Sequence, residues 1–189
     1  MSLTSKEWKL LLAGVALTSM SALLIELALT RLFSVLLYYH FAFMAISVAL
    51  LGLGAGGLAS YWIAGDAPLE RLWPRLTLLA AGFAVVTVGA LYVVVRVLDW
   101  IPSLSAALPV LYFVSTVPFF FAGVILAVLL SRTSEHAGAV YFADLAGAGG
   151  GCLLLIPLLN WLGGPSALLV AALVAALSAL IWRDRKSVV

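Results

Sequence analysis

The sequence predicts an all-α integral membrane protein with six transmembrane helices in a single domain, residues 1–189. Of its residues, 65% are hydrophobic and only 10% are charged, whereas about 25% of an ordinary soluble domain is charged. Six apolar stretches each approach or exceed the roughly 20 helical residues that cross a bilayer core of about 30 Å. Most basic residues lie beside alternate ends of these stretches. A water-soluble fold is therefore excluded.

Short segments that are polar or contain glycine or proline separate the apolar stretches. In chain order, we expect helices at Leu10–Phe33, Leu36–Ala64, Leu76–Leu98, Leu108–Leu130, Ala139–Leu162 and Ser166–Trp182. Pro68 and Pro74 fall in the second connection, and Gly163-Gly164-Pro165 forms the tight last one. The first stretch follows Lys6 and Lys9, as a signal peptide would, but it is longer than a signal core of about 7 to 15 residues. We therefore expect an uncleaved helix.

The basic residues predict the orientation, because Lys and Arg near helix ends favour the cytoplasmic side of a membrane. With the N-terminus inside, eight of the ten lie on inner segments, and only Arg31 and Arg96 lie toward the outside. The eight are Lys6, Lys9, Arg71, Arg75, Arg132, Arg183, Arg185 and Lys186. Both termini are therefore expected in the cytoplasm. All six tryptophans lie near predicted helix ends, which places their indole rings in the headgroup layer.

Charge and cysteine content narrow the class of function. A formal net charge of only +2 leaves no basic surface for the phosphates of nucleic acid. The single cysteine, Cys152, excludes an internal disulfide and a cysteine-based zinc cage. We expect His40 and His136 on opposite sides of the membrane, and Asp144 in the leaflet opposite to that of His40. We therefore expect no metal, no cofactor and no catalytic residues of the Ser-His-Asp kind.

The tetrapeptide Gly-Ala-Gly-Gly occurs at Gly54–Gly57 and again at Gly147–Gly150, about half the chain apart. This spacing suggests two three-helix halves. Because three is odd, the second half would be threaded in the opposite direction, as in the inverted repeats of several transporters. Chance occurrence in a membrane sequence rich in glycine and alanine is the alternative.

Gly52, Gly54 and Gly57 also form a Gly-x-Gly-x-x-Gly pattern. A dinucleotide site would need a strand before this pattern and the start of a helix after it, and neither fits inside a membrane helix. We therefore expect the glycines to permit close helix packing. The expected packing positions are Gly52, Gly54, Gly56, Gly57, Gly147 and Gly151.

Charged residues within the spans are candidates for a binding site, because each costs about 2.5 to 3.5 kcal/mol at a helix centre. Glu26 and Arg31 are five apart in the first helix, too far around it to stack directly. One hypothesis groups Glu26 with Tyr39 and His40 in an outward-facing polar pocket, and Arg31 is a further candidate binding residue. The alternative is that Arg31 reaches the outer headgroups while Glu26 is protonated or hydrogen-bonded to a neighbouring helix.

Asp144 follows Tyr141 by three residues and precedes Gly147 by three, so these residues share one helix face. A desolvated carboxylate beside an aromatic ring suits an ammonium group or a proton. The alternative is a buried aspartate that accepts a hydrogen bond from a hydroxyl across a helix interface.

The motif Glu26-Leu-Ala-Leu-Thr30-Arg31 resembles the Glu-x-x-x-Thr-Arg that ends the first membrane helix of bacterial spermidine synthase-like membrane proteins. Phe41–Gly57 resembles the second-helix block of that family, and Tyr141-Phe-Ala-Asp144-Leu-Ala-Gly147 resembles its fifth-helix block. The resemblance covers nearly the whole chain. Leu29 departs from it, because an aromatic residue is common there.

The resemblance implies a multi-pass protein of the bacterial cytoplasmic membrane. In this family, the helical region typically precedes a methyltransferase-like domain that binds decarboxylated S-adenosylmethionine and a polyamine. No such domain precedes Val189, so the expected function is a non-catalytic membrane module that anchors or serves a cytoplasmic enzyme. Two alternatives are a small dimeric transporter of polyamines or other cations and a structural subunit of a larger membrane complex. The expected partners are lipid, other membrane subunits or a second copy of the chain, and a cytoplasmic synthase-like domain.

Overall fold

The computed structural model describes residues 4–37, 39–65, 67–101 and 103–184. Six helices in this part of the chain are long and apolar enough to cross a membrane. They are α1 (Ser5–Leu36), α2 (Ala42–Ala64), α3 (Leu69–Trp100), α4 (Leu104–Arg132), α5 (Ala137–Leu162) and α6 (Gly164–Asp184). Short 3-10 turns, η1 (Tyr39–Phe41) and η2 (Ser134–His136), precede α2 and α5. The predicted all-α fold with six spans is confirmed.

The helix ends differ from the predicted ones where polar residues continue a helix beyond its apolar stretch. Thr4 caps α1, because its hydroxyl accepts a hydrogen bond from the Glu7 backbone N–H at 3.4 Å while the Glu7 carboxylate accepts one from the Thr4 N–H at 2.7 Å. The second helix begins at Ala42 rather than Leu36, because α1 continues through Leu36. Pro74 lies inside α3, in its second turn, and not in a connection. Its missing N–H removes one hydrogen bond of the helix, and the helix continues through it.

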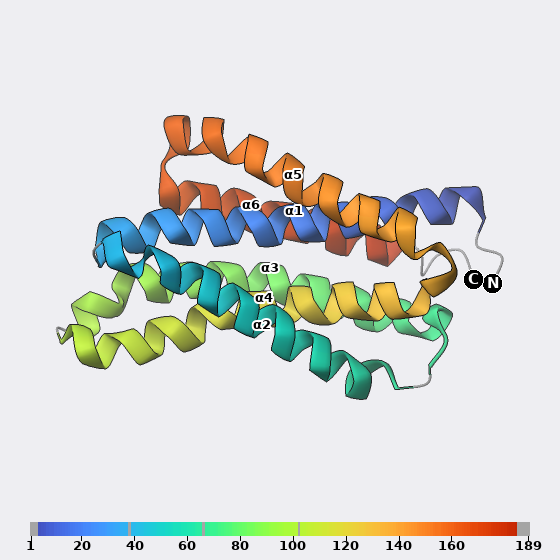
Figure 1. Cartoon of the computed structure of the whole chain (residues 1–189), viewed down its shortest axis with the longest axis horizontal. Coiled ribbons are helices and arrows are strands. Elements are labelled where there is room, and N and C mark those ends of the chain that lie inside the picture. Colours follow the sequence, from blue (N-terminus) through green and yellow to red (C-terminus); the bar gives the residue numbers. More distant parts are fainter. Residues whose placement is uncertain (1–3, 38, 66, 102, 185–189) are drawn as a thin grey trace.

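The centre of the bundle consists of α1, α3, α4 and α6, and α2 and α5 lie on its outside (Figure 1). In the centre, α6 packs against both α1 and α3, and α3 packs against α4. Outside, α5 packs mainly on α1, and α2 packs mainly on α4. The start of α1 and the end of α6 lie at the same end of the bundle (Figure 1).

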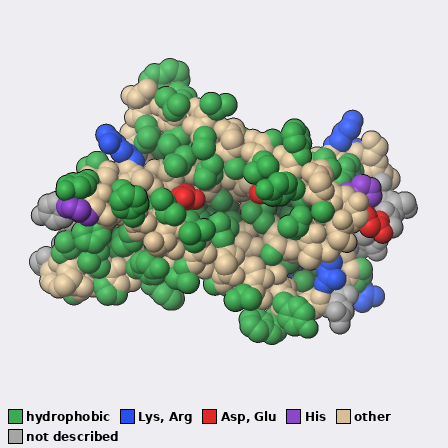
Figure 2. Space-filling model, viewed as in Figure 1, with side chains coloured by type: hydrophobic (Ala, Val, Ile, Leu, Met, Phe, Trp, Pro, Cys, Tyr) green, Lys and Arg blue, Asp and Glu red, His purple; other side chains and the backbone are tan. Residues whose placement is uncertain are grey.

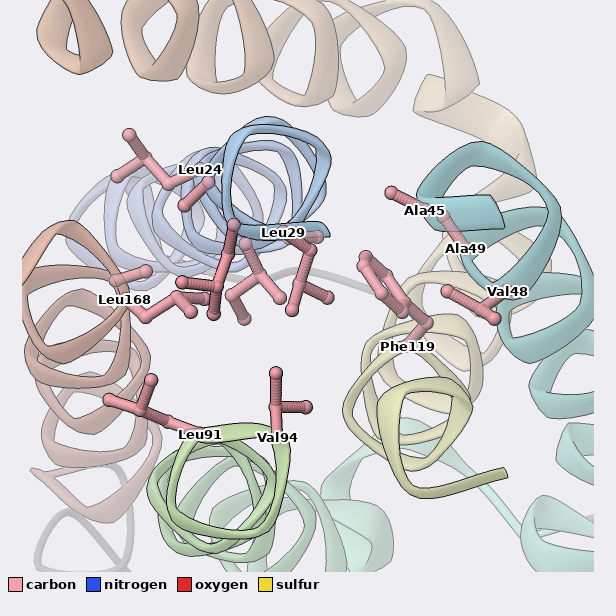
Figure 3. Packing of buried hydrophobic residues seen from close by; sticks show 14 of the residues in the cluster. Leu24, Leu29, Ala45, Val48, Ala49, Leu91, Val94, Phe119 and Leu168 are labelled. Carbon is pink, nitrogen blue, oxygen red and sulfur yellow. The ribbon is translucent and has the colours of Figure 1, made fainter. Parts of the chain in front are cut away.

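Apolar side chains fill the bundle in two clusters. The first includes residues of α1, α2, α3, α4 and α6. Figure 3 shows its members Leu24, Leu29, Ala45, Val48, Ala49, Leu91, Val94, Phe119 and Leu168. Burying such side chains fixes which face of each helix meets its neighbours, while the lipid-facing sides remain exposed and apolar.

The second cluster includes Trp182 of α6, which is fully buried. Its ring stacks on Trp73 of α3, with centroids 5.9 Å apart, and covers Gly14 of α1, where a Cβ atom would overlap the indole. Trp182 therefore packs inside the bundle near the end of α6, because the missing side chain of Gly14 leaves room for the ring.

Candidate functional site

The contact between α5 and α1 is built on two glycines one helical turn apart. A Cβ atom on Gly147 would overlap the backbone of Ala16 at its carbonyl. A Cβ atom on Gly151 would lie 2.9 Å from the carbonyl oxygen of Met20, closer than real side chains approach. Only glycine therefore permits this separation of the two helices.

The contact between α2 and α4 repeats this arrangement. A Cβ atom on Gly52 would lie 2.6 Å from the carbonyl oxygen of Thr116, and one on Gly56 would overlap the carbonyl of Phe120. From the other side, Gly123 of α4 lies against the backbone of Leu53. Both contacts therefore place glycines four residues apart against carbonyls four residues apart.

Two of the six predicted packing glycines do not lie at a helix contact. Added Cβ atoms on Gly54 and Gly57 would meet no atom of another helix within 4 Å. The prediction is wrong for these two, because two positions along the helix rotate Gly54 by about 200°, and five positions rotate Gly57 by about 140°, away from the face that Gly52 occupies. Gly52, Gly56, Gly147 and Gly151 do lie at close helix contacts.

Asp144 lies in the contact between α5 and α1. The hydroxyl of Ser19 donates a short hydrogen bond to Oδ1 of Asp144. Ser19 is only 4% exposed and Asp144 is half-buried. The geometry is that of an aspartate accepting a hydrogen bond from a hydroxyl across a helix interface, and the bond offsets part of the cost of placing a carboxylate there.

A small cavity of about 120 Å³ borders Asp144 and Tyr141, between α5, α4 and α1. Its remaining lining side chains are apolar: Val15, Leu126, Ala127, Leu130 and Val140. Tyr141 is itself 57% exposed on the outer side of α5. The structure therefore brings Tyr141 and Asp144 together, with Asp144 as the one carboxylate at this cavity.

The residues predicted to form an outward-facing pocket lie in separate surroundings. Tyr39 and His40 are exposed and contact each other, with ring centroids 3.7 Å apart. Arg31 lines a cavity of about 530 Å³ with the end of α5 and the start of α6. Glu26 is half-buried in α1. Within the described ranges, no hydrogen bond, ion pair or ring contact joins Glu26 to Tyr39 or His40, so these contacts do not support the pocket.

Sequence reasoning missed the hydroxyl groups of α1. Besides Ser19, the Thr18 hydroxyl lies 3.2 Å from that of Ser178 in α6, and the Ser21 hydroxyl donates to the Ala171 carbonyl at 2.7 Å. Three hydroxyl residues within four positions of an apolar helix were the available signal. They show that α1 is bonded on one side to α5 and on the other to α6.

Metal-ligating side chains do not gather in the described part of the chain. No group of three His, Cys, Asp or Glu residues there could hold a metal ion. Figure 2 shows histidine side chains at both ends of the bundle and acidic side chains within the otherwise apolar middle of the visible face.

No family model, curated protein or solved structure matches this chain. What the protein does is therefore inferred from its own residues and contacts.

Proposed function

We propose that this six-helix membrane protein is a non-catalytic module of the spermidine synthase-like kind, which anchors or serves a cytoplasmic enzyme or a membrane complex. The assignment to that kind rests on the sequence resemblance, and one observation carries the non-catalytic role: the carboxylate of Asp144, the main candidate binding group, accepts a hydrogen bond from buried Ser19 in the contact between α1 and α5. A carboxylate used in this way holds two helices together.

The other polar side chains of α1 support the same role. Thr18 and Ser21 bond to α6, so α1 is tied on two sides. Hydrogen bonds between membrane helices contribute about 0.6 kcal/mol each on average. Together with the glycine contacts, they favour a rigid bundle suited to holding a partner.

The glycine contacts also support a 3+3 inverted repeat. Under this repeat, α2 corresponds to α5 and α1 corresponds to α4. Each glycine-bearing second helix then packs on the first helix of the other half, Gly52 and Gly56 on α4 and Gly147 and Gly151 on α1. The matching pairs are Gly52 with Gly147 and Gly56 with Gly151, a different correspondence from that of the Gly-Ala-Gly-Gly tetrapeptides.

A cytoplasmic partner requires the termini to face the cytoplasm, as the basic residues predict. Single cysteines at opposite ends of the bundle test this orientation. In intact cells, Ser5→Cys should be protected from an impermeant thiol reagent, and Ser105→Cys at the start of α4 should react. The reverse pattern would contradict the orientation. The background variant Cys152→Ser removes the native thiol.

A transporter of polyamines or other cations is the second candidate, favoured by the cavity beside Asp144 and Tyr141 and by the crossed packing of the two halves. In a transporter, the carboxylate of Asp144 would lose its hydrogen bond to Ser19 and bind a proton or an ammonium group. Gly54 is exposed and Gly57 is half-buried, and a Cβ atom on either would meet no other helix, so both leave room for a second copy or another subunit to pack there.

Flux measurements in liposomes separate the two candidates. For a scaffold, purified protein should move spermidine, putrescine and protons no faster than protein-free liposomes do. Saturable flux that Asp144→Asn abolishes, and that the exposed control Asp99→Asn retains, would overturn the scaffold in favour of the transporter. Melting temperatures of both variants verify that each is folded.

The partner itself is tested by a photocrosslinking residue at Ser134, at the predicted cytoplasmic end. It should capture a synthase-like enzyme or a defined membrane subunit, and the same residue at Ser105 should not. Capture of equal strength at both positions would count against a specific cytoplasmic partner.

A further inference from the structure

A cavity of about 550 Å³ lies at the end of the bundle where α1 begins and α4 ends. Its walls come from the first turns of α1, including Trp8, from Arg132 at the end of α4, and from the segment that joins α4 to α5, including Glu135. Its volume is in the range of about 300 to 1,000 Å³ typical of small-molecule sites. It is separate from the contacts around Asp144.

The cavity carries one positive and one negative side chain that are not paired with each other. Arg132 donates from Nη2 to the carbonyl of Gly65, which fixes the guanidinium, and its Nε has no partner. Glu135 is exposed and makes no hydrogen bond or ion pair with any residue that the structure describes.

An aromatic wall completes the cavity. The rings of Trp8 and His136 lie with centroids 5.1 Å apart at an angle of 57°. An indole ring attracts ammonium groups through its face. Ser134 adds an exposed hydroxyl to the lining. The lining therefore offers a fixed cation and a hydroxyl for a phosphate, together with a carboxylate and an indole for an ammonium group.

We propose that this cavity binds a zwitterionic group that carries both a phosphate and a primary ammonium. Arg132 and Ser134 hold the phosphate, and Glu135 and Trp8 hold the ammonium. A simple anion is repelled by Glu135 and a simple cation by Arg132, so the lining selects the paired charge. The source is an aminophospholipid such as phosphatidylethanolamine, whose headgroup lies at the level of the helix ends, or soluble phosphoethanolamine. The site does not depend on whether the bundle is a scaffold or a transporter.

Native mass spectrometry of the purified protein, titrated with defined short-chain lipids, tests this site. Phosphatidylethanolamine should bind about two- to fivefold more tightly than phosphatidylglycerol, as expected for an ion pair to an exposed carboxylate. Glu135→Gln, an exposed substitution that leaves the fold intact, should remove this preference. Arg132→Gln should weaken both lipids.

Matched controls lie at the opposite end of the bundle. Asp99→Asn and Arg31→Gln should keep the wild-type preference for phosphatidylethanolamine. Wild-type protein that binds phosphatidylglycerol equally well, or Glu135→Gln protein that keeps the preference, would overturn the proposal. Competition by free phosphoethanolamine would support a soluble source, and Glu135-dependent binding of the lipid without such competition would support the membrane source.

Discussion

The contact between α1 and α5 and the contact between α2 and α4 use the same glycine spacing, yet only the first holds a charged residue beside its glycines. Three positions before Gly147, Asp144 accepts a hydrogen bond from Ser19. Three positions before Gly52, the residue is Ala49, which is buried with Phe119 of α4 in an apolar cluster. Figure 3 shows Ala49 and Phe119 in this second contact.

The α2–α4 contact teaches that glycines and apolar side chains suffice to join two helices of this bundle. Asp144 therefore adds something to the α1–α5 contact beyond what close packing needs. A charged group at a helix centre costs about 2.5 to 3.5 kcal/mol, and the Ser19 hydroxyl offsets part of that cost. The hydrogen bond fixes which residues of α1 and α5 face each other. Packing alone specifies this register less strictly.

Leucine at the packing glycines should have the largest effect. Gly147→Leu and Gly56→Leu place a side chain where even a Cβ atom overlaps backbone. Each should lower the free energy of unfolding by about 4 kcal/mol or more, enough to prevent folding in a marginal protein. Gly54→Leu is the control and should change it by less than about 0.5 kcal/mol. Thermal unfolding in detergent measures all three, and equal losses for Gly54 and Gly147 would contradict the packing.

A carboxylate introduced into the apolar contact sharpens the comparison. Ala49→Asp places the charge of Asp144 at the equivalent position, but Phe119 offers no hydroxyl in place of Ser19. We expect a loss of about 3 kcal/mol in the free energy of unfolding. Ala49→Asn, which is polar but uncharged, should lose less. Wild-type stability for Ala49→Asp would show that this contact is wet or loosely packed.

The ends of α1 and α4 extend the comparison. Arg132, near the end of α4, donates to the carbonyl of Gly65, which follows α2. Arg31, near the end of α1, is exposed beside the turn that follows α5. Arg132→Gln should lower the free energy of unfolding by about 1 kcal/mol, and Arg31→Gln should leave it nearly unchanged. If Arg31→Gln lowers the free energy of unfolding more than Arg132→Gln does in the same melting experiment, the assignment of Arg132 as the stabilising arginine is wrong.

Much of the fold could be predicted because span length and hydropathy follow directly from the thickness of a bilayer. The glycine spacing in Gly52, Gly56, Gly147 and Gly151 likewise identified one packing face on each helix. Which helix packs against each glycine face could not be predicted, since any apolar helix can pack closely against glycines.

The site was predicted only in part. Asp144 was identified because a carboxylate is rare in a membrane helix. Its partner Ser19 was not, because serine is tolerated on any face of such a helix and lies far from Asp144 in sequence. The burial of Trp182 was missed for a similar reason: it depends on the space that Gly14 of another helix leaves.

A double-mutant cycle between Ser19 and Asp144 tests most directly whether this pair holds α1 and α5 together. Ser19→Ala, Asp144→Ala and the double variant are compared with wild type by reversible unfolding in detergent. The double variant should be more stable than the sum of the single losses predicts, with a coupling free energy of about 1 kcal/mol. Strictly additive losses would contradict the claim and would leave Asp144 free for a role other than joining the two helices.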